Sequence, residues 1–270
     1  MRTLVHLSDL HFGAIDETTV GPLQKSLAEI APDLVAISGD LTQRARRAEF
    51  QAAKDFLDRL LFPKIVVPGN HDVPAYNLVA RFLHPLDKYR RYITEDLRPF
   101  YIDEEIAVVG VNTARSFAIK GGRVNEEQMN WVNEKLGNLR AGVMRIVVSH
   151  HPFDLLEGRN PSCLVGRARL ALKKFANHVD IFLAGHLHVG HSGPGSLGCQ
   201  GDIHPALVLQ AGTATSLRRR GEVNSFNVLR IDRWDVAIEQ YQWNPKQGLF
   251  ATSKVEGFRR GEKGWAKPPS

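Results

Sequence analysis

The chain has 270 residues, of which 43% are hydrophobic and 24% are charged. These fractions are ordinary for soluble globular proteins that bury a sizeable core, and no window approaches the ~18 apolar residues of a membrane-spanning helix. The formal net charge of +6 favours anionic ligands in general, but it is spread too widely to indicate a nucleic-acid-binding protein.

Cysteine content and the start of the chain limit its environment. Cys163 and Cys199 are the two cysteines, so we expect two free thiols and neither a disulfide framework nor a cysteine-bound zinc ion. The first residues, Met1 to Asp9, lack the long apolar stretch of a signal peptide. We therefore expect a cytoplasmic protein.

Strand and helix patterns alternate through the first two thirds of the chain. Short apolar runs rich in β-branched residues predict strands at Thr3–Leu7, Leu34–Ser38, Lys64–Val67, Ile106–Val111, Arg145–Ser149, Asp180–Ala184, Ala206–Gln210, Ser225–Ile231 and Val236–Trp243. Helical periodicity predicts helices at Leu23–Ile30, Ala45–Leu61, Tyr76–Tyr92, Glu126–Leu136 and Arg167–Asn177. After about His186 the helical patterns stop. We expect one α/β domain of two packed sheets with helices on their outer faces.

Two segments have no strand or helix pattern. Residues Gly190–Gly201 are rich in glycine and predict a mobile loop. Residues 251–270 are basic and interrupted by glycine and proline, and they show no periodicity. We therefore place the folded domain at residues 1–250 and a basic C-terminal tail at 251–270.

Polar side chains that can bind metals follow the predicted strands, at the place where α/β sheets locate their sites. The motifs, in chain order, are Asp9-Leu10-His11, Gly39-Asp40, Gly69-Asn70-His71-Asp72, His150-His151-Pro152 and Gly185-His186-Leu187-His188. Each fragment alone is common in ordinary turns. Their joint occurrence, in order and each after a strand, indicates a metal site.

The spacing and residue types fit a site for two ions. Asp9 with His11, and His186 with His188, are two residues apart, so both side chains of a pair lie on the same side of an extended segment. We expect the glycines before Asp40, Asn70 and His186 to permit sharp turns. Carboxylate, imidazole and amide ligands suit manganese, iron, zinc or cobalt. Asp40 stands alone in its motif and is the natural bridge between two ions.

In this order the motifs resemble those of the calcineurin-like metallophosphoesterases, over Asp9 to His188. The resemblance implies a four-layer α-β-β-α sandwich of two mixed sheets flanked by helices. It also implies two metal ions, which could be Mn²⁺, Fe²⁺ or Fe³⁺, Zn²⁺ or Co²⁺. By position, one ion would be held by Asp9, His11, Asp40 and His188, and the other by Asp40, Asn70, His150 and His186.

The resemblance also implies catalytic roles. His71 would donate a proton or hydrogen bond to the phosphate and its leaving oxygen, and Asp72 would orient the His71 imidazole. Within the His-His-Pro motif the resemblance selects His150 as the ligand and leaves His151 to line the substrate pocket. Asn70, His71, His151 and His191 are the candidate substrate-binding residues.

The opening Asp9-Leu10-His11-Phe12-Gly13 and the stretch Gly39–Thr42 are most similar to bacterial class III cyclic-nucleotide phosphodiesterases and glycerophosphodiesterases. We expect a hydrolase for a small phosphodiester. A nuclease or nucleotide-lipid pyrophosphatase and a noncatalytic scaffold stay as alternatives. The sequence departs from the resemblance after His188, where Arg218-Arg219-Arg220 suits either a solvated turn or a polyanion site. The oligomeric state stays open, a homodimer included.

Overall fold

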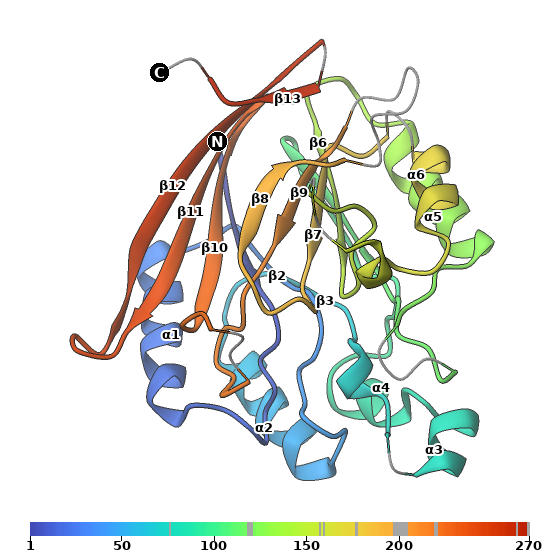
Figure 1. Cartoon of the computed structure of the whole chain (residues 1–270), viewed down its shortest axis with the longest axis vertical. Helices are drawn as coiled ribbons and strands as arrows, with labels where there is room; N and C mark the ends of the chain where they lie inside the picture. Colours follow the sequence, from blue (N-terminus) through green and yellow to red (C-terminus); the bar gives the residue numbers. More distant parts are fainter. Residues whose placement is uncertain are drawn as a thin grey trace.

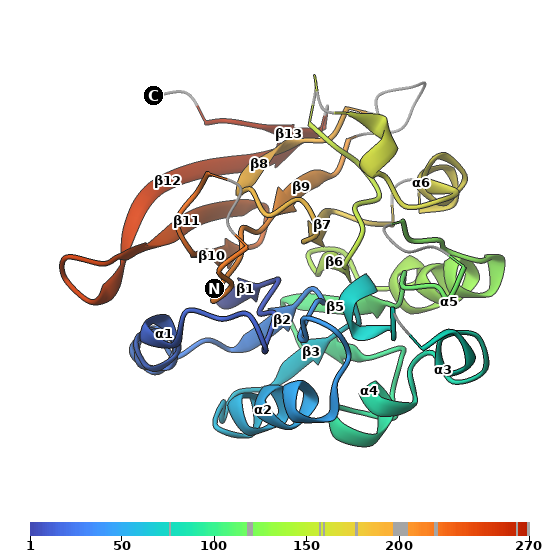
Figure 2. The ribbon, with the colours of Figure 1, turned by 60° about the horizontal axis from the view of Figure 1, so that its bottom comes forward.

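In the computed structural model, two β-sheets pack face to face and helices cover both outer faces (Figures 1 and 2). This is the predicted α/β sandwich of four layers. The structure describes residues 1–75, 77–117, 121–156, 158, 160–175, 178–196, 205–218, 221–262 and 264–268.

The first sheet has seven strands, in spatial order β13 (Gly264–Ala266), β12 (Leu249–Gly261), β11 (Asp235–Asn244), β10 (Ser225–Asp232), β1 (Arg2–Leu7), β2 (Leu34–Ile37) and β3 (Lys64–Val66). Its strands β1, β2 and β3 run parallel, and β10 to β13 continue the sheet in antiparallel pairs. The second sheet has six strands, in spatial order β4 (Phe100–Ile102), β5 (Ile106–Val111), β6 (Met144–Ser149), β7 (Ile181–Ala184), β9 (Leu207–Gln210) and β8 (His191–Pro194). Its two edge strands, β4 and β8, are antiparallel to their neighbours.

Helices divide between the two outer faces. The α-helices are α1 (Glu17–Ile30), α2 (Arg47–Asp58), α3 (Leu78–Leu83), α4 (Asp87–Tyr92), α5 (Glu126–Gly137) and α6 (Ala168–Phe175). Residues of α1, α2 and α4 pack on the first sheet, and residues of α5 and α6 pack on the second. A third core fills the space between the sheets. The side-chain alternation of a strand explains this division, because Leu4 of β1 faces the space between the sheets while Val5 faces the helices.

The nine predicted strands are all present, and β4, β8, β12 and β13 were not predicted. The helix predicted over Tyr76–Tyr92 is two short helices, α3 and α4, and Tyr76 itself lies outside the described residues. Pro85 explains the interruption, because a proline disfavours helical backbone in the residue before it. His84 accordingly ends α3 with φ −138° and ψ 51°. Of the helix predicted over Arg167–Asn177, residues 176 and 177 lie outside the described residues.

The segment 251–270 is part of the first sheet rather than the predicted tail. Most of it lies in β12, which pairs with β11 from Leu249 to Arg259, and in β13. Phe258 and Trp265 are buried in the core between the sheets, and Trp265 Nε1 donates a hydrogen bond to the Asp180 carbonyl at 2.9 Å. Charged and polar side chains on the exposed face of β12 hide this strand pattern in the sequence.

The segment predicted as a mobile loop, Gly190–Gly201, begins with a strand. Residues His191–Pro194 form β8 and pair with β9, whereas residues 197–201, with Cys199, lie outside the described residues. Cys163 is a free thiol, as expected.

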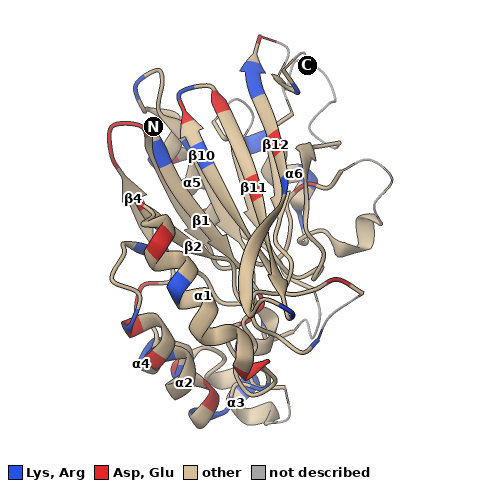
Figure 3. Ribbon diagram, turned by 90° about the vertical axis from the view of Figure 1, so that its left-hand side faces the viewer, with Lys and Arg blue, Asp and Glu red and all other residues tan. Residues whose placement is uncertain are grey.

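Charge is distributed over the surface. Figure 3 shows Lys and Arg together with Asp and Glu on α1, α2, α4 and β10 to β12. In the part of the chain that the structure describes, no helix has the length and apolar character needed to cross a membrane.

Candidate metal centre

The predicted ligands lie in the loops that follow β1, β2, β3, β6 and β7. Three of these strands are parallel neighbours in the first sheet, and β6 and β7 are parallel neighbours in the second. Because the carboxyl ends of parallel strands meet at one edge, each sheet brings its ligands to one end. The contacts between Asp40 and His150 join the two sheets at this edge.

The first cluster contains Asp9, His11, Asp40 and His188, all buried, with ligand atoms within 4.8 Å of one another. Asp9 Oδ1 lies 3.1 Å from His188 Nε2 and 3.5 Å from His11 Nε2. These four residues form the set that the resemblance implies for the first ion.

The second group of ligands surrounds His150. His150 Nε2 lies 3.1 Å from Asn70 Oδ1 and 3.4 Å from Asp40 Oδ2, and its ring centroid is 5.1 Å from that of His186. The structure therefore brings together the residues expected for the second ion. It also brings in His151, whose ligand atom lies within 4.8 Å of those of His150 and His186.

Asp40 lies between the two groups. Its Oδ2 is 3.7 Å from His11 Nε2 on one side and 3.4 Å from His150 Nε2 on the other. Its Oδ1 accepts a hydrogen bond from the His71 backbone N–H at 2.8 Å, which fixes the orientation of the carboxylate. This is the arrangement that a bridging carboxylate requires.

Five of the seven predicted ligands have left-handed backbone conformations. Their φ angles are 53° for Asp9, 53° for His11, 53° for Asp40, 70° for His186 and 59° for His188. Non-glycine residues rarely adopt positive φ, and those that do often lie in functional sites, where the surrounding structure maintains the strain. The backbone therefore turns sharply at these residues, which aims their side chains into one space.

Two glycines leave room for this centre, for a reason that differs from the predicted one. Gly69 has φ −105°, so it does not need the left-handed region. A Cβ at Gly69 would overlap the Asp40 backbone N and carboxylate, and one at Gly185 would overlap Ser8 Oγ and lie 2.7 Å from Asp9 Oδ2. Close approach of the chain, rather than a sharp turn, explains these two glycines.

The ring nitrogens that point away from the centre are held by backbone carbonyls. Nδ1 of His11 lies 3.3 Å from the Thr42 carbonyl, Nδ1 of His150 lies 2.8 Å from that of Ser38, and Nδ1 of His188 lies 2.9 Å from that of Arg218. A carbonyl only accepts, so each Nδ1 carries the proton and Nε2 offers its lone pair to the centre.

Buried polar atoms without a partner test whether a metal fits. Among the described residues, Asp9 Oδ1 and His11 Nε2 are buried and make no hydrogen bond. A buried carboxylate oxygen is costly when it is unpaired, and a cation between these atoms would satisfy both. The donor atoms are oxygen and nitrogen with no thiolate, which fits manganese, iron, zinc or cobalt.

The charges of the centre are strongly coupled. Burial would raise the pKa of Asp9, but the adjacent His11 and His188 imidazoles outweigh burial and hold that pKa well below its usual value. Burial would lower the pKa of His150, but the Asp40 carboxylate outweighs it and raises the pKa to about 9. Burial, together with the charge of His150, lowers the pKa of His186 to about 4. The carboxylates of the centre therefore carry negative charge, which bound protons or cations must balance.

His71 lies beside the first cluster and is half-buried. Its ring stands edge-on to that of His11 at a centroid distance of 4.9 Å, and its Nδ1 lies 2.8 Å from the Gln43 carbonyl. Its Nε2 lies 2.7 Å from Arg218 Nη1. Burial lowers the pKa of His71, against the opposing charge of Asp40.

The hydrogen bonds of Asp72 correct its predicted role. Its carboxylate accepts from the backbone N–H groups of Gly69 at 2.9 Å, Leu41 at 3.2 Å and Thr42 at 2.9 Å, and from Thr42 Oγ1 at 3.0 Å. The Gln43 carbonyl, not Asp72, holds the His71 imidazole. Asp72 instead ties the loop after β2 to the loop after β3.

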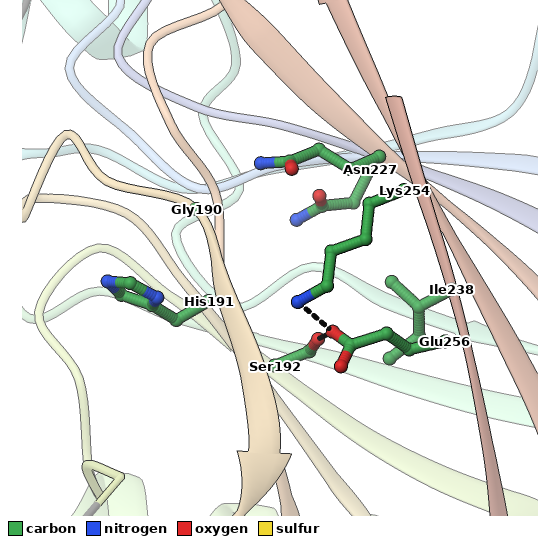
Figure 4. Close-up of a pocket in the computed structure, with 8 residues that line it drawn as sticks. Gly190, His191, Ser192, Asn227, Ile238, Lys254 and Glu256 are labelled. Atoms are coloured by element: carbon green, nitrogen blue, oxygen red, sulfur yellow. Dashed lines mark hydrogen bonds and ion pairs between the residues drawn. The ribbon is translucent and has the colours of Figure 1, made fainter. Parts of the chain in front are cut away.

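Two predicted substrate residues, His151 and His191, have the following surroundings. His151 is 1% exposed, and its Nδ1 lies 2.9 Å from Thr113 Oγ1, so it supports the second ligand group instead of lining an open pocket. His191 begins β8 and borders a polar cavity of about 20 Å³, large enough for about one water. Figure 4 shows its ring pointing away from the Lys254–Glu256 ion pair of this cavity.

Sequence reasoning missed the residues that support the ligands. Gln43 and Thr42 hold histidine rings through their carbonyls, and Ser8 Oγ donates to Asp9 Oδ2 at 2.6 Å. The hydrogen-bond partner of a backbone carbonyl cannot be recognised from the residue type in the sequence. Thr113 follows a predicted strand, and Arg218 lies in a basic run. These positions were the only signals in the sequence for the two residues. Arg219 and Arg220 lie outside the described residues.

Comparisons with known proteins agree with this geometry. The family model for calcineurin-like phosphoesterases matches residues 2–190. The glycerophosphodiester phosphodiesterase GpdQ of Enterobacter lignolyticus is 27% identical over 199 residues, which are 68% of this chain and 70% of that protein. The 3',5'-cyclic adenosine monophosphate phosphodiesterase CpdA of Escherichia coli is 26% identical over 164 residues, 58% of this chain and 54% of that protein.

Solved structures agree with the fold. A dimetal phosphatase from Danio rerio superposes with a TM-score of 0.67 at 14% identity, covering 95% of this chain and 98% of that one. The purple acid phosphatase PPD1 of yellow lupin gives a TM-score of 0.66 at 13% identity, over 93% of this chain and 52% of that one.

Proposed function

Because this chain belongs to the calcineurin-like phosphoesterase family, we propose that it hydrolyses a small phosphodiester with two metal ions. In this proposal Asp9, His11, Asp40 and His188 hold one ion. Asp40, Asn70, His150 and His186 hold the other. The observation that carries the proposal is the position of Asp40, whose Oδ2 lies between His11 Nε2 and His150 Nε2.

In this proposal the metal ions and the protein chain contribute different parts of the chemistry. When bound, two divalent ions would supply a hydroxide near neutral pH and would neutralise charge on the phosphoryl oxygens. The chain would position the ions through histidine rings that are held by backbone carbonyls, and most of these ligands are buried. His150 keeps its Nδ1 on the Ser38 carbonyl, so Nε2 stays directed at Asp40 and Asn70.

His71 is the proposed proton donor. The Gln43 carbonyl fixes Nδ1, so Nε2 is the ring atom available to the leaving oxygen of the substrate, and it must take up a proton in place of the Arg218 hydrogen bond before it can donate one. A positioned histidine of this kind typically contributes roughly 10²–10⁴-fold to a rate. Arg218 lies at the same atom and offers guanidinium N–H groups to a phosphate oxygen.

The proposed substrate class rests on the similarity of this chain to known phosphodiesterases. The relatives described above are a glycerophosphodiesterase and a cyclic-nucleotide phosphodiesterase, which favour a small diester of one of these types. Manganese, iron, zinc or cobalt as the metals, and a cytoplasmic location, are further parts of the proposal.

A substrate panel tests the proposal. Metal-loaded protein would be assayed with bis-p-nitrophenyl phosphate, p-nitrophenyl phosphate, cyclic nucleotides, glycerophosphodiesters and single-stranded DNA. We expect the small diesters to be hydrolysed fastest. Monoesters hydrolysed far faster than every diester would show that the substrate class is wrong, and preference for DNA would favour a nuclease.

A further inference from the structure

An exposed apolar surface lies on α3 and the loop after β5. It consists of Leu78, Val79, Phe82, Leu83 and Phe117, whose exposed fractions range from 47% for Phe82 to 92% for Phe117. The Phe82 and Phe117 rings contact each other at a centroid distance of 5.2 Å. Contiguous exposed apolar groups of this size mark interaction sites in soluble proteins. We call these five residues the α3 apolar surface.

The α3 apolar surface is held in place by a buried arginine. Arg81, 3% exposed, donates from Nε to the Ser116 carbonyl at 2.6 Å and from Nη1 to the Pro74 carbonyl at 3.0 Å. Asn77 Oδ1 caps the helix by accepting from the Ala80 N–H at 2.9 Å. These bonds fix α3 against the loop that carries Phe117, so the apolar side chains are presented outward on a defined support.

A basic groove borders this surface. The groove has a volume of about 340 Å³, and its described lining residues include Arg44, Arg46 and Lys88. Glu49 lies behind Arg46, with Oε1 4.0 Å from Arg46 Nε, so three cations outnumber one carboxylate here. Lys88 Nζ donates to the Ala45 carbonyl at 2.7 Å, which holds its charge at the groove. Asn77 lines the groove and directly precedes Leu78, so the basic groove and the α3 apolar surface are continuous.

Both features are linked along the chain to residues of the metal centre. Arg44 follows Gln43, whose carbonyl contacts His71 Nδ1. Phe117 follows by four residues Thr113, whose hydroxyl contacts His151. Figure 2 shows α2, α3 and α4 along one side of the molecule. The groove residues come from the segments just before α2 and α3 and from α4.

We propose that the α3 apolar surface and the basic groove together dock on an anionic phospholipid bilayer. The aromatic and aliphatic side chains enter the acyl boundary, and Arg44, Arg46 and Lys88 contact the lipid phosphates. Charge complementarity selects this partner. A second copy of the chain, related by a twofold axis, would place these basic residues against their own copies, and like charges oppose such contact.

Vesicle sedimentation tests the proposal with the full chain. Phosphatidylglycerol–phosphatidylcholine vesicles should bind the protein at low salt, and pure phosphatidylcholine vesicles should bind it at least tenfold more weakly. Replacing the two rings, in Phe82→Ser with Phe117→Ser, should weaken binding about tenfold or more. Removing two charges, in Arg44→Gln with Arg46→Gln, should weaken it about fivefold per charge.

Matched controls separate this surface from general effects. Leu61→Ser with Val255→Ser removes two exposed apolar side chains elsewhere, and Lys25→Gln with Lys246→Gln removes the same net charge elsewhere. Both control variants should bind like the wild type. All variants should keep their thermal unfolding midpoint and their hydrolysis of bis-p-nitrophenyl phosphate, so that misfolding is detected.

Three results would overturn the proposal. These are absence of binding to anionic vesicles, equal loss of binding in the test and control variants, and a wild-type dimer that the ring variant converts to a monomer. The last result would assign the surface to a second copy. Vesicle binding does not depend on turnover, so an Asp40→Asn variant should still sediment with the vesicles.

Discussion

The Arg218 guanidinium lies 2.7 Å, through Nη1, from Nε2 of His71. Arginine has no acceptor atom, so His71 Nε2 accepts this bond and the ring carries its proton on Nδ1, toward the Gln43 carbonyl. The backbone carbonyl of Arg218 also accepts from His188 Nδ1 at 2.9 Å. One residue thus contacts both the proposed proton donor and a proposed metal ligand, through different groups.

Arg218→Ala should raise the KM for a phosphodiester about tenfold or more, because a guanidinium contacts a phosphate oxygen more strongly than water does. Metal content should not change, since the carbonyl that holds His188 remains. Arg218→Lys should recover only part of the loss, because lysine lacks the planar fork. Steady-state kinetics with metal analysis check this, and Arg59→Ala, an exposed arginine at the end of α2, is the control. An unchanged KM for Arg218→Ala would remove Arg218 from the substrate site.

His71→Ala should reduce kcat by roughly 10²–10⁴-fold for a diester with an alkoxide leaving group, which needs a proton to depart. The reduction should be much smaller for bis-p-nitrophenyl phosphate, since nitrophenolate is a weak base. The measured quantity is the ratio of the kcat reductions for the two substrates. His84→Ala, an exposed histidine paired with Asp87, should leave both rates near wild type. Equal loss on both substrates would mean that His71 does not act by proton donation.

Gly69→Ala should disrupt the centre, because the added methyl group overlaps the Asp40 carboxylate and backbone N. We expect a loss of about 1–3 kcal/mol in the free energy of unfolding, together with weaker metal binding. Gly21→Ala is the matched control, since nothing lies within 4 Å of a Cβ at that position in α1. Chemical denaturation and metal titration of both variants check this. Normal metal binding by Gly69→Ala would contradict the described packing.

Metal binding should strengthen as the pH rises toward 9. The pKa of His150 in the folded, metal-free protein is raised to about 9, so protonation of His150 stabilises this state. The stabilisation is complete below about pH 6.5 and is lost as the pH rises through 9. A metal must displace this proton. Calorimetric titration with Mn²⁺ at pH 7.5, in buffers of different ionisation enthalpy, measures the number of protons released on metal binding.

His186 provides the comparison for this titration, because its pKa is lowered to about 4 and it has no proton to release at pH 7.5. His150→Ala should therefore release about one proton fewer than His186→Ala, although both lose a ligand. Equal proton release by the two variants would contradict the assigned protonation of His150.

The sequence predicted the parts of the molecule that local pattern controls. The β-branched runs identified the central strands, and the motifs after them identified the ligand groups that the structure brings together, because each depends on residues close in sequence. Strand β12 was missed because its exposed face carries polar and charged side chains that mask the alternation. Charge composition there reflects solvent exposure and gives no information on backbone pairing.

The supporting contacts could not be predicted, because they join distant segments. Gln43 and His71 are 28 residues apart, and Arg218 and His71 are 147 apart. Asp72 illustrates the same limit, since its neighbour in the sequence is His71 but its carboxylate accepts from the backbone N–H groups of Leu41 and Thr42 in the loop after β2, as well as from Gly69 in its own loop. The family resemblance implied His71 as the partner of Asp72, and the folded loops give Asp72 other partners.

Metal stoichiometry tests the central claim, that two ions share Asp40. After loading with Mn²⁺ and desalting, elemental analysis should find two ions per wild-type chain and one in Asn70→Ala, which loses a ligand of the second ion only. Asp40→Ala should hold fewer than one, because both ions lose a ligand. A single ion in the wild type, or an Asp40→Ala variant that retains one ion as Asn70→Ala does, would contradict the shared carboxylate.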